Sequence, residues 1–198
     1  MKDVTEHVVL EERAADKTVL FGFWLYLMTD FVLFASLFAV YAVLHNNTFG
    51  SPGSHDIFSA PFVLLETLIL LASSFVCGLA LIAAHEGNRK GVIALLGATA
   101  ALGALFVGLE VNEFAHLEAA GSGWWQSGFL SSYFTLVGTH GLHVSVGILW
   151  MLVLIGMIAK RGLSRGNMRK LAMLAIFWHF LDLVWIFIFT IVYMMGLL

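Results

Sequence analysis

The sequence predicts an all-α integral membrane protein, a bundle of five transmembrane helices with a cytoplasmic N-terminus and a C-terminus on the opposite side. Of its 198 residues, 60% are hydrophobic and 12% charged, and the mean hydropathy is +0.92. That is too little charge to cover a soluble domain of this length. Five apolar segments each reach the roughly 20 residues that a helix needs to cross the hydrocarbon core of a bilayer. The basic residues occur only in alternate connections, which predicts the orientation.

The first element is a polar tail, residues 1–19, which precedes a membrane domain at 20–198. We expect the tail to be retained on the surface and partly helical, because it lacks the basic start, apolar core and small-residue cleavage site of a signal peptide. Short connections predict that successive helices are antiparallel neighbours. The five helices are expected at about residues 20–44, 61–84, 91–115, 131–159 and 171–198.

The connections differ in charge. Residues 45–60, with Gly50-Ser51-Pro52-Gly53, and residues 117–126, with the interfacial pair Trp124-Trp125, are predicted loops without Lys or Arg. All 10 basic residues lie before the first helix, between the second and third, or between the fourth and fifth. Under the positive-inside rule, those three places are cytoplasmic.

Small residues predict close packing of the third and fourth helices. The single cysteine, Cys77, excludes an intramolecular disulfide and any thiolate cluster built by this chain alone. No internal repeat is evident, which counts against a transporter. The small residues are Gly97, Ala98, Ala100, Ala101, Gly103, Ala104 and Gly108 on the third helix, and Gly138, Gly141, Ser145 and Gly147 on the fourth.

The most informative stretch is Trp178–Trp185 in the last helix, where His179 and Asp182 share one face. Ionisable groups within a membrane are costly unless they are paired or face a protein interior. Counting the helical rise of about 1.5 Å per residue places the candidate residues in two layers. The central layer is Asp30, His143, His179 and Asp182; the outer layer is Glu66, Glu110 and His140, with Glu113 near the outer end of its helix.

Four roles are open for these groups. Imidazoles on opposing helices could ligate a haem, and His140 and His143 have a spacing permissible for zinc or copper. A chain of acids and histidines could form a proton relay. Alternatively, the groups form a buried polar network that bridges helices or contacts lipid headgroups and partner subunits. With no complete ligand set evident, we expect no catalytic, cofactor-binding or metal-binding residue in this chain.

Several of these motifs resemble subunit III of haem–copper terminal oxidases. The resemblance runs from about Gly22 to Gly196, nearly the whole chain. Five helices after a short polar N-terminus are most similar to the bacterial cytochrome bo-type ubiquinol oxidase. Asp30 departs from the cytochrome c branch, which has a glutamate there. The motifs are the run Phe177–Phe187, Gly138–Val144, Gly22–Asp30, Glu66-Thr67 with Leu70–Ser74, and Gly108–Glu110 with Glu113-Phe114.

The resemblance implies a non-redox accessory subunit of a proton-pumping respiratory complex in the bacterial inner membrane. Haem, copper and ubiquinol belong to partner subunits, and the chain is an enzyme only as part of the complex, which oxidises ubiquinol and reduces dioxygen to water. It implies direct contact with subunit I, which the chain stabilises, association with subunits II and IV, and bound phospholipid. No nucleic-acid partner is expected. The alternatives are subunit III of a cytochrome c oxidase, an autonomous membrane haem protein or a small transporter.

Overall fold

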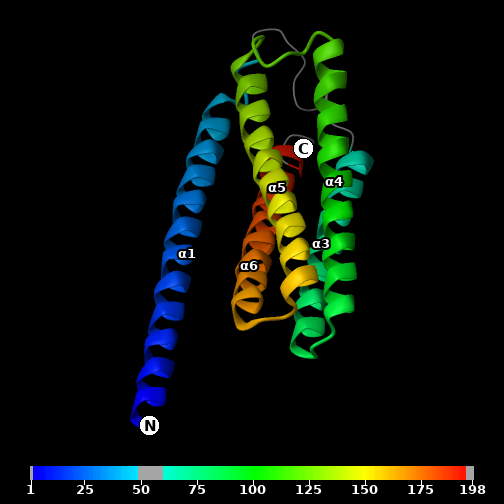
Figure 1. Cartoon of the computed structure of the whole chain (residues 1–198). Helices are drawn as coiled ribbons and strands as arrows, with labels where there is room; N and C mark the ends of the chain where they lie inside the picture. The colour runs from blue at the N-terminus through cyan, green and yellow to red at the C-terminus, as the bar shows by residue number, and fades with distance from the viewer. Residues whose placement is uncertain (1, 49–59, 195–198) are drawn as a thin grey trace. The chain divides into compact units, whose positions relative to one another are not determined.

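The computed structural model describes the backbone of residues 2–48 and 60–194, and the side chains of 17–48 and 61–194. These residues form helices and short connections, with no strand among them. Five helices are long and apolar enough to cross a membrane, which confirms the predicted all-α class (Figure 1). They are α1 (Lys2–Leu44), α3 (Ala60–His85), α4 (Arg89–Ala119), α5 (Gly128–Arg161) and α6 (Arg165–Ile188), which continues as a π-helix, η1 (Phe189–Met194).

The observed helices are longer than the apolar segments that predicted them. The first begins at Lys2 instead of near residue 20, so the polar tail is a continuation of α1. The last begins at Arg165 instead of near residue 171. Hydropathy marks only the stretch that lipid can surround, whereas a helix continues as long as its backbone hydrogen bonds do. The predicted loop motif Gly50-Ser51-Pro52-Gly53 and residues 195–198 lie outside the described part of the chain.

The chain divides into two compact units, residues 1–36 and residues 37–198. The first unit is the greater part of α1. Within it, the Tyr26 hydroxyl forms a hydrogen bond with the carboxylate of Asp30, four residues further along the helix. An intramembrane acid of this unit therefore has a local partner, as the cost of burying a charge in a membrane requires.

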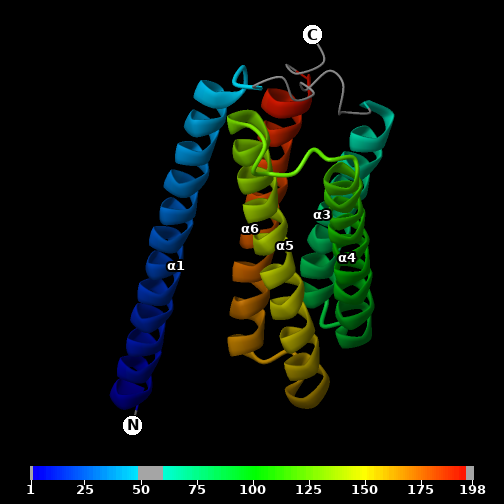
Figure 2. The same cartoon turned by 90° about the horizontal axis from the view of Figure 1, so that it is seen from above.

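The second unit is a ring of four helices. Helix α3 packs against α4, α4 against α5, α5 against α6, and α6 returns to α3 (Figures 1 and 2). The connections between α3 and α4 and between α5 and α6 are only a few residues long, so these neighbours are antiparallel. The ring has an interior that all four helices share, and Trp178 and Trp185 of α6 are buried.

Side-chain caps define where three of these helices begin. Each cap oxygen accepts a hydrogen bond from a backbone N–H of the first turn, which has no partner within the helix. At the other end of α5, Gly162 has a positive φ of 69°, a conformation that favours glycine and ends the helix. The N-caps are Asn88 of α4, Ser127 of α5 and Ser164 of α6.

Candidate functional site: the polar seam between α3 and α6

Polar and aromatic side chains join α3 to α6 along their line of contact. We call this group the polar seam. It contains the residues that made the last helix stand out in the sequence, together with hydroxyl groups of α3 that face them. Its members are Trp178, His179, Asp182 and Trp185 on α6, and Thr67, Ser73 and Ser74 on α3.

The two tryptophans of the seam are fully buried and each donates its indole N–H to a hydroxyl of α3. Trp178 Nε1 lies 3.0 Å from Ser73 Oγ, and Trp185 Nε1 lies 3.1 Å from Thr67 Oγ1. Trp178 and Trp185 are seven residues apart, two helical turns, and therefore lie on one face of α6. With no water in the bilayer core, each indole N–H needs such an acceptor.

The accepting hydroxyls are themselves held in place by their own helix. Ser73 Oγ donates to the carbonyl of Leu70 over 2.7 Å, and Thr67 Oγ1 donates to the carbonyl of Val63 over 2.9 Å. A hydroxyl has one proton to donate, so the direction of each hydrogen bond is fixed. Each hydroxyl therefore accepts from an indole on α6 and donates within α3.

The third link of the seam joins three residues. Ser74 Oγ lies 2.8 Å from Nδ1 of His179 and also forms a hydrogen bond with Asp182. Because an ionised carboxylate only accepts, Ser74 donates to Asp182 and accepts from the Nδ1–H of His179. The predicted partnership of His179 and Asp182 thus runs through a serine of α3.

This third link lies at the edge of the seam. Asp182 is half-buried and His179 is exposed, whereas the two tryptophans are buried. A histidine and an acid on the outer side of a membrane helix face lipid or another protein. Exposing their polar groups to hydrocarbon costs free energy. This edge is therefore the part of the seam suited to contact with a partner.

Glycines of two further helices enclose the Trp178 ring. A Cβ added at Gly103 of α4 would come 2.7 Å from one ring atom, and a Cβ at Gly147 of α5 would come 2.9 Å from another. Real Cβ atoms do not approach so closely, so these two positions admit only glycine without rearrangement. The predicted close packing of the small-residue helices is thus present around one indole ring.

The ring of Trp185 has aromatic neighbours instead. Its centroid lies 4.7 Å from that of Phe106 at an interplanar angle of 86°, an edge-to-face arrangement. The imidazole of His140 lies 5.3 Å from the Trp185 ring and is fully buried. His143, one turn further along α5, places Nδ1 2.8 Å from the carbonyl oxygen of Thr139 on its own helix.

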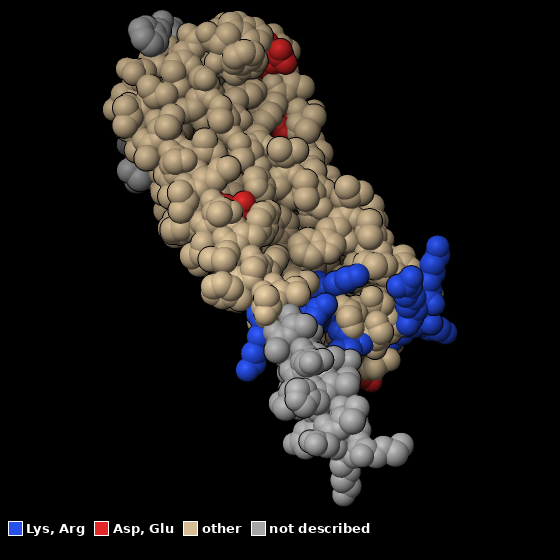
Figure 3. Space-filling model, turned by 60° about the vertical axis from the view of Figure 1, so that its left-hand side comes forward, with Lys and Arg blue, Asp and Glu red and all other residues tan. Residues whose placement is uncertain are grey.

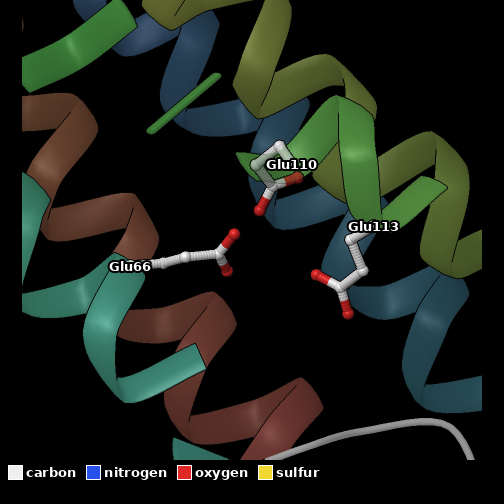
Figure 4. A group of neighbouring side chains, drawn as sticks. All are labelled: Glu66, Glu110 and Glu113. Carbon is white, nitrogen blue, oxygen red and sulfur yellow. The ribbon is translucent and has the colours of Figure 1, made fainter. Parts of the chain in front are cut away.

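Three glutamates form a second polar group, which we call the acidic cluster. Glu66 of α3 and Glu110 and Glu113 of α4 each offer a carboxylate oxygen, and these atoms all lie within 4.8 Å of one another. Figure 4 shows the three side chains converging from the two helices. Glu113 also forms a hydrogen bond with Tyr133 of α5, whose hydroxyl lies 3.0 Å from that of Tyr193 in η1.

The structure brings together some of the predicted site residues and separates others. His179 and Asp182 of the central layer meet at Ser74. From the outer layer, Glu66 and Glu110 meet in the acidic cluster. Three predicted residues lie elsewhere: His140 packs beside Trp185, His143 bonds to its own helix, and Asp30 belongs to the first unit.

Several residues that complete these groups were not predicted as site residues. Glu113 was placed near the outer end of its helix but not grouped with Glu110, although the two are three residues apart and share a face. The need of two buried indoles for acceptors could have pointed to hydroxyls two turns apart on a neighbouring helix, but not to which helix. The residues are Thr67, Ser73, Ser74, Glu113, Tyr133 and Tyr193.

Known proteins are similar to this chain over most of its length. The family model described as "Cytochrome c oxidase subunit III" matches residues 2–197. The chain is 60% identical to cytochrome bo(3) ubiquinol oxidase subunit 3 of Pseudomonas aeruginosa over 178 residues, which are 90% of this chain and 85% of that protein. It is 45% identical to quinol oxidase subunit 3 of Bacillus spizizenii, covering 89% of this chain and 86% of that one. Cytochrome c oxidase subunit 3 of a Bacillus species is 44% identical over 91% of this chain and 87% of its own length.

The five apolar helices and this match define the class: an integral subunit of a respiratory oxidase of the bacterial cytoplasmic membrane. The chain belongs to the cytochrome c oxidase subunit III family. It is therefore an accessory chain of an oxidoreductase complex, and the resemblance carried by Phe177–Phe187 is confirmed.

Proposed function

We propose that this chain serves as the non-redox subunit III of a proton-pumping ubiquinol oxidase and stabilises the catalytic subunit I. The observation that carries the proposal is the polar seam. Its indole rings fill the interior of the α3–α6 ring and tie two helices together by direct hydrogen bonds. Because the two indole rings occupy this interior and bond to α3, it supports a role in keeping the helices in register and not in binding a cofactor.

The contacts of the histidines support the absence of a haem in this chain. The imidazole of His140 packs between aromatic rings, His143 bonds to a carbonyl of its own helix, and His179 bonds to Ser74. A haem held by two of these histidines would need their imidazoles aimed at one iron from opposing sides. These contacts support our placement of haem and copper in the partner subunits.

The exposed edge of the seam is the proposed contact with subunit I or with a phospholipid headgroup. His179 and Asp182 place an imidazole and a carboxylate beside the exposed apolar side chains of Leu183, Ile186 and Phe187. A polar pair within an apolar face favours a partner that supplies matching polar groups. Subunits II and IV complete the proposed complex.

The distribution of basic residues supports an N-terminus in the cytoplasm and a C-terminus in the periplasm. The start of α4, the end of α5 and the start of α6 carry Lys and Arg, and the guanidinium of Arg89 donates to the carbonyl of Ala159. On the face seen in Figure 3, Lys and Arg lie together at one end. Positive charge favours the cytoplasmic side.

The electron donor is the first property to test. The relatives include both quinol oxidase and cytochrome c oxidase subunits. The intact complex purified through a tag on this chain should turn over with ubiquinol and not with reduced cytochrome c. Turnover with cytochrome c but not ubiquinol would assign the chain to the alternative branch.

The remaining alternatives are an autonomous haem protein and a small transporter. Both are tested on the isolated chain, the first by its visible spectrum and the second by ion flux in liposomes. A featureless visible spectrum and no ion flux in liposomes support the accessory role. Stoichiometric haem, or flux through the chain alone, would overturn it.

A further inference from the structure

Hydrogen bonds between helices do not explain the acidic cluster. It combines carboxylate oxygens of Glu66, Glu110 and Glu113 within 4.8 Å of one another, on two helices that are long and apolar enough to cross a membrane. Three ionised carboxylates at that separation repel one another strongly in a low dielectric. The repulsion is removed if the carboxyl groups hold protons, and it is offset if a cation lies among the carboxylates.

Two members of the cluster are completely enclosed and lack partners. Glu66 has no exposed surface and Glu110 is 3% exposed. Within residues 17–48 and 61–194, where side chains are described, no hydrogen bond is made by either carboxylate oxygen of Glu66 or of Glu110. Buried polar groups nearly always have a partner, and an exception needs an explanation. Both carboxylates are aimed at the centre of the cluster (Figure 4).

The Lys and Arg side chains of the bundle are too far away to supply the balancing charge. His116 of α4 lies one turn beyond Glu113 but is exposed. Arg89 and Lys90 are at the first turn of α4, 20 residues or more before Glu110. At a rise of about 1.5 Å per residue, that is about 30 Å along the helix. The basic residues at the end of α5 and the start of α6 lie at the same end as Arg89, whose side chain bonds to Ala159.

The third glutamate is held in position by a chain of hydroxyls. Tyr133 bonds to Glu113 and lies 3.0 Å from the Tyr193 hydroxyl. When Glu113 is ionised it accepts from Tyr133, so Tyr193 must in turn donate to Tyr133. A hydrogen bond to one oxygen of a carboxylate orients the group and leaves its other oxygen free to bind a ligand. Ligating carboxylates in metal sites are commonly oriented by hydrogen bonds of this kind.

We propose that the acidic cluster is a cation site that binds one divalent, oxygen-preferring ion of the size of Ca²⁺. Ca²⁺ takes about 6–8 oxygen ligands and accepts several carboxylates, whereas Mg²⁺ is usually held by about one or two carboxylates and keeps several waters. Three carboxylates whose ligand oxygens lie within 4.8 Å of one another suit the larger ion. Glu66 and Glu110 supply their four unpartnered oxygens, and Glu113 supplies one. The ion links α3 to α4 and offsets most of the negative charge.

The site is within reach of the aqueous phase. Glu66 is in the second turn of α3, and Glu113 is two turns before the end of α4. Glu113 is the only partly buried member of the cluster, although its Oε2 is buried. The end of the bundle where α3 begins and α4 ends is therefore the shorter route for a cation to the cluster.

Calcium binding by the purified oxidase complex tests this proposal independently of which donor the complex oxidises. The complex is stripped with a chelator and equilibrated with ⁴⁵Ca²⁺, and wild type is compared with Glu110→Gln, Glu66→Gln and Glu118→Gln. Glu118 is exposed on the same helix and is the matched control. We expect the first two variants to lose about one bound Ca²⁺ per complex and Glu118→Gln to lose none. Equal binding by wild type and Glu110→Gln would overturn the proposal.

Thermal unfolding gives a second readout, because Ca²⁺ should change the Tm of the wild type and of the variant differently. Added Ca²⁺ should raise the Tm of the wild-type complex but not that of Glu110→Gln, since a ligand stabilises only the state that binds it. In chelator the variant should be at least as stable as wild type, because the substitution removes a repelling charge. If either buried variant fails to assemble, Glu113→Gln, at the least buried member of the cluster, gives the same comparison. A wild-type Tm that is indifferent to Ca²⁺ would contradict the site.

Discussion

The indole ring of Trp178 lies directly against Gly103 of the neighbouring helix, so that a Cβ at residue 103 would be only 2.7 Å from the ring. The same indole donates its N–H to Ser73 over 3.0 Å. Trp178 of α6 thus sets how closely α4 approaches α6, and it sets the register of α3 against α6. Close packing around small residues and hydrogen bonds between helices are the two main forces of membrane helix association, and here they meet at one side chain.

Gly103→Ala should destabilise the complex. The added methyl overlaps the Trp178 ring, and overpacking of this kind costs about 1–3 kcal/mol. Gly97→Ala is the control, because it lies on the same helix and a Cβ there meets nothing within 4 Å. Thermal unfolding of the purified complex should show a lower Tm for residue 103 alone. Equal Tm values for both variants would show that the indole moves aside freely.

Ser73→Ala should also lower stability, because it leaves the buried N–H of Trp178 without an acceptor. Hydrogen bonds between membrane helices contribute about 0.6 kcal/mol on average and up to about 1.7 kcal/mol. Ser145→Ala, which removes a hydroxyl bonded only to the carbonyl of Gly141 on its own exposed helix face, should have a smaller effect. The comparison is made by denaturation of the two assembled complexes in the same detergent.

The link through Ser74 predicts non-additive effects. Asp182→Ala should lower the yield of assembled complex, and Ser74→Ala should lower it for the same reason, since each breaks the connection from His179 to Asp182. Residues that share one hydrogen-bonded network show interaction energies of about 0.5–3 kcal/mol in a double-mutant cycle. The double variant should therefore lose less stability than the sum of the single ones. Strict additivity would mean that Ser74 does not join the two residues.

Asp30→Asn should leave oxidase turnover largely intact. The Asp30 side chain bonds to Tyr26 within its own helix, and an amide can keep such a hydrogen bond. Oxygen consumption and proton ejection are measured together on the same preparation in liposomes. Loss of proton pumping by a normally assembled variant would favour a proton relay through Asp30.

The sequence was sufficient to predict the fold class and the importance of the last helix. Long apolar segments are visible without a structure because a bilayer requires them. Polar residues within them are equally visible because they are costly and therefore rare. The full extent of α1 could not be predicted from hydropathy. Its polar first residues are helical from Lys2, and a polar helix differs little in composition from a polar loop.

The partners of the site residues were harder to predict than the residues themselves. Depth along the membrane correctly grouped Glu66 with Glu110, but it also grouped His140 with them, because depth fixes one coordinate and leaves the rotation of each helix open. The structure turns His140 toward Phe106 and Trp185 instead. Likewise, His179 and Asp182 could be paired from their spacing, but the serine of α3 between them could not be found.

We propose that this chain stabilises a catalytic core without contributing redox chemistry. Deleting the gene for the chain and purifying the remaining complex tests this most directly, by its haem spectrum, copper content and time course of ubiquinol oxidation. We predict that the core keeps its full haem and copper content and its initial turnover, but loses activity faster and unfolds at a lower temperature. A core that has lost a haem or copper, or that assembles fully and cannot turn over at all, would contradict the account.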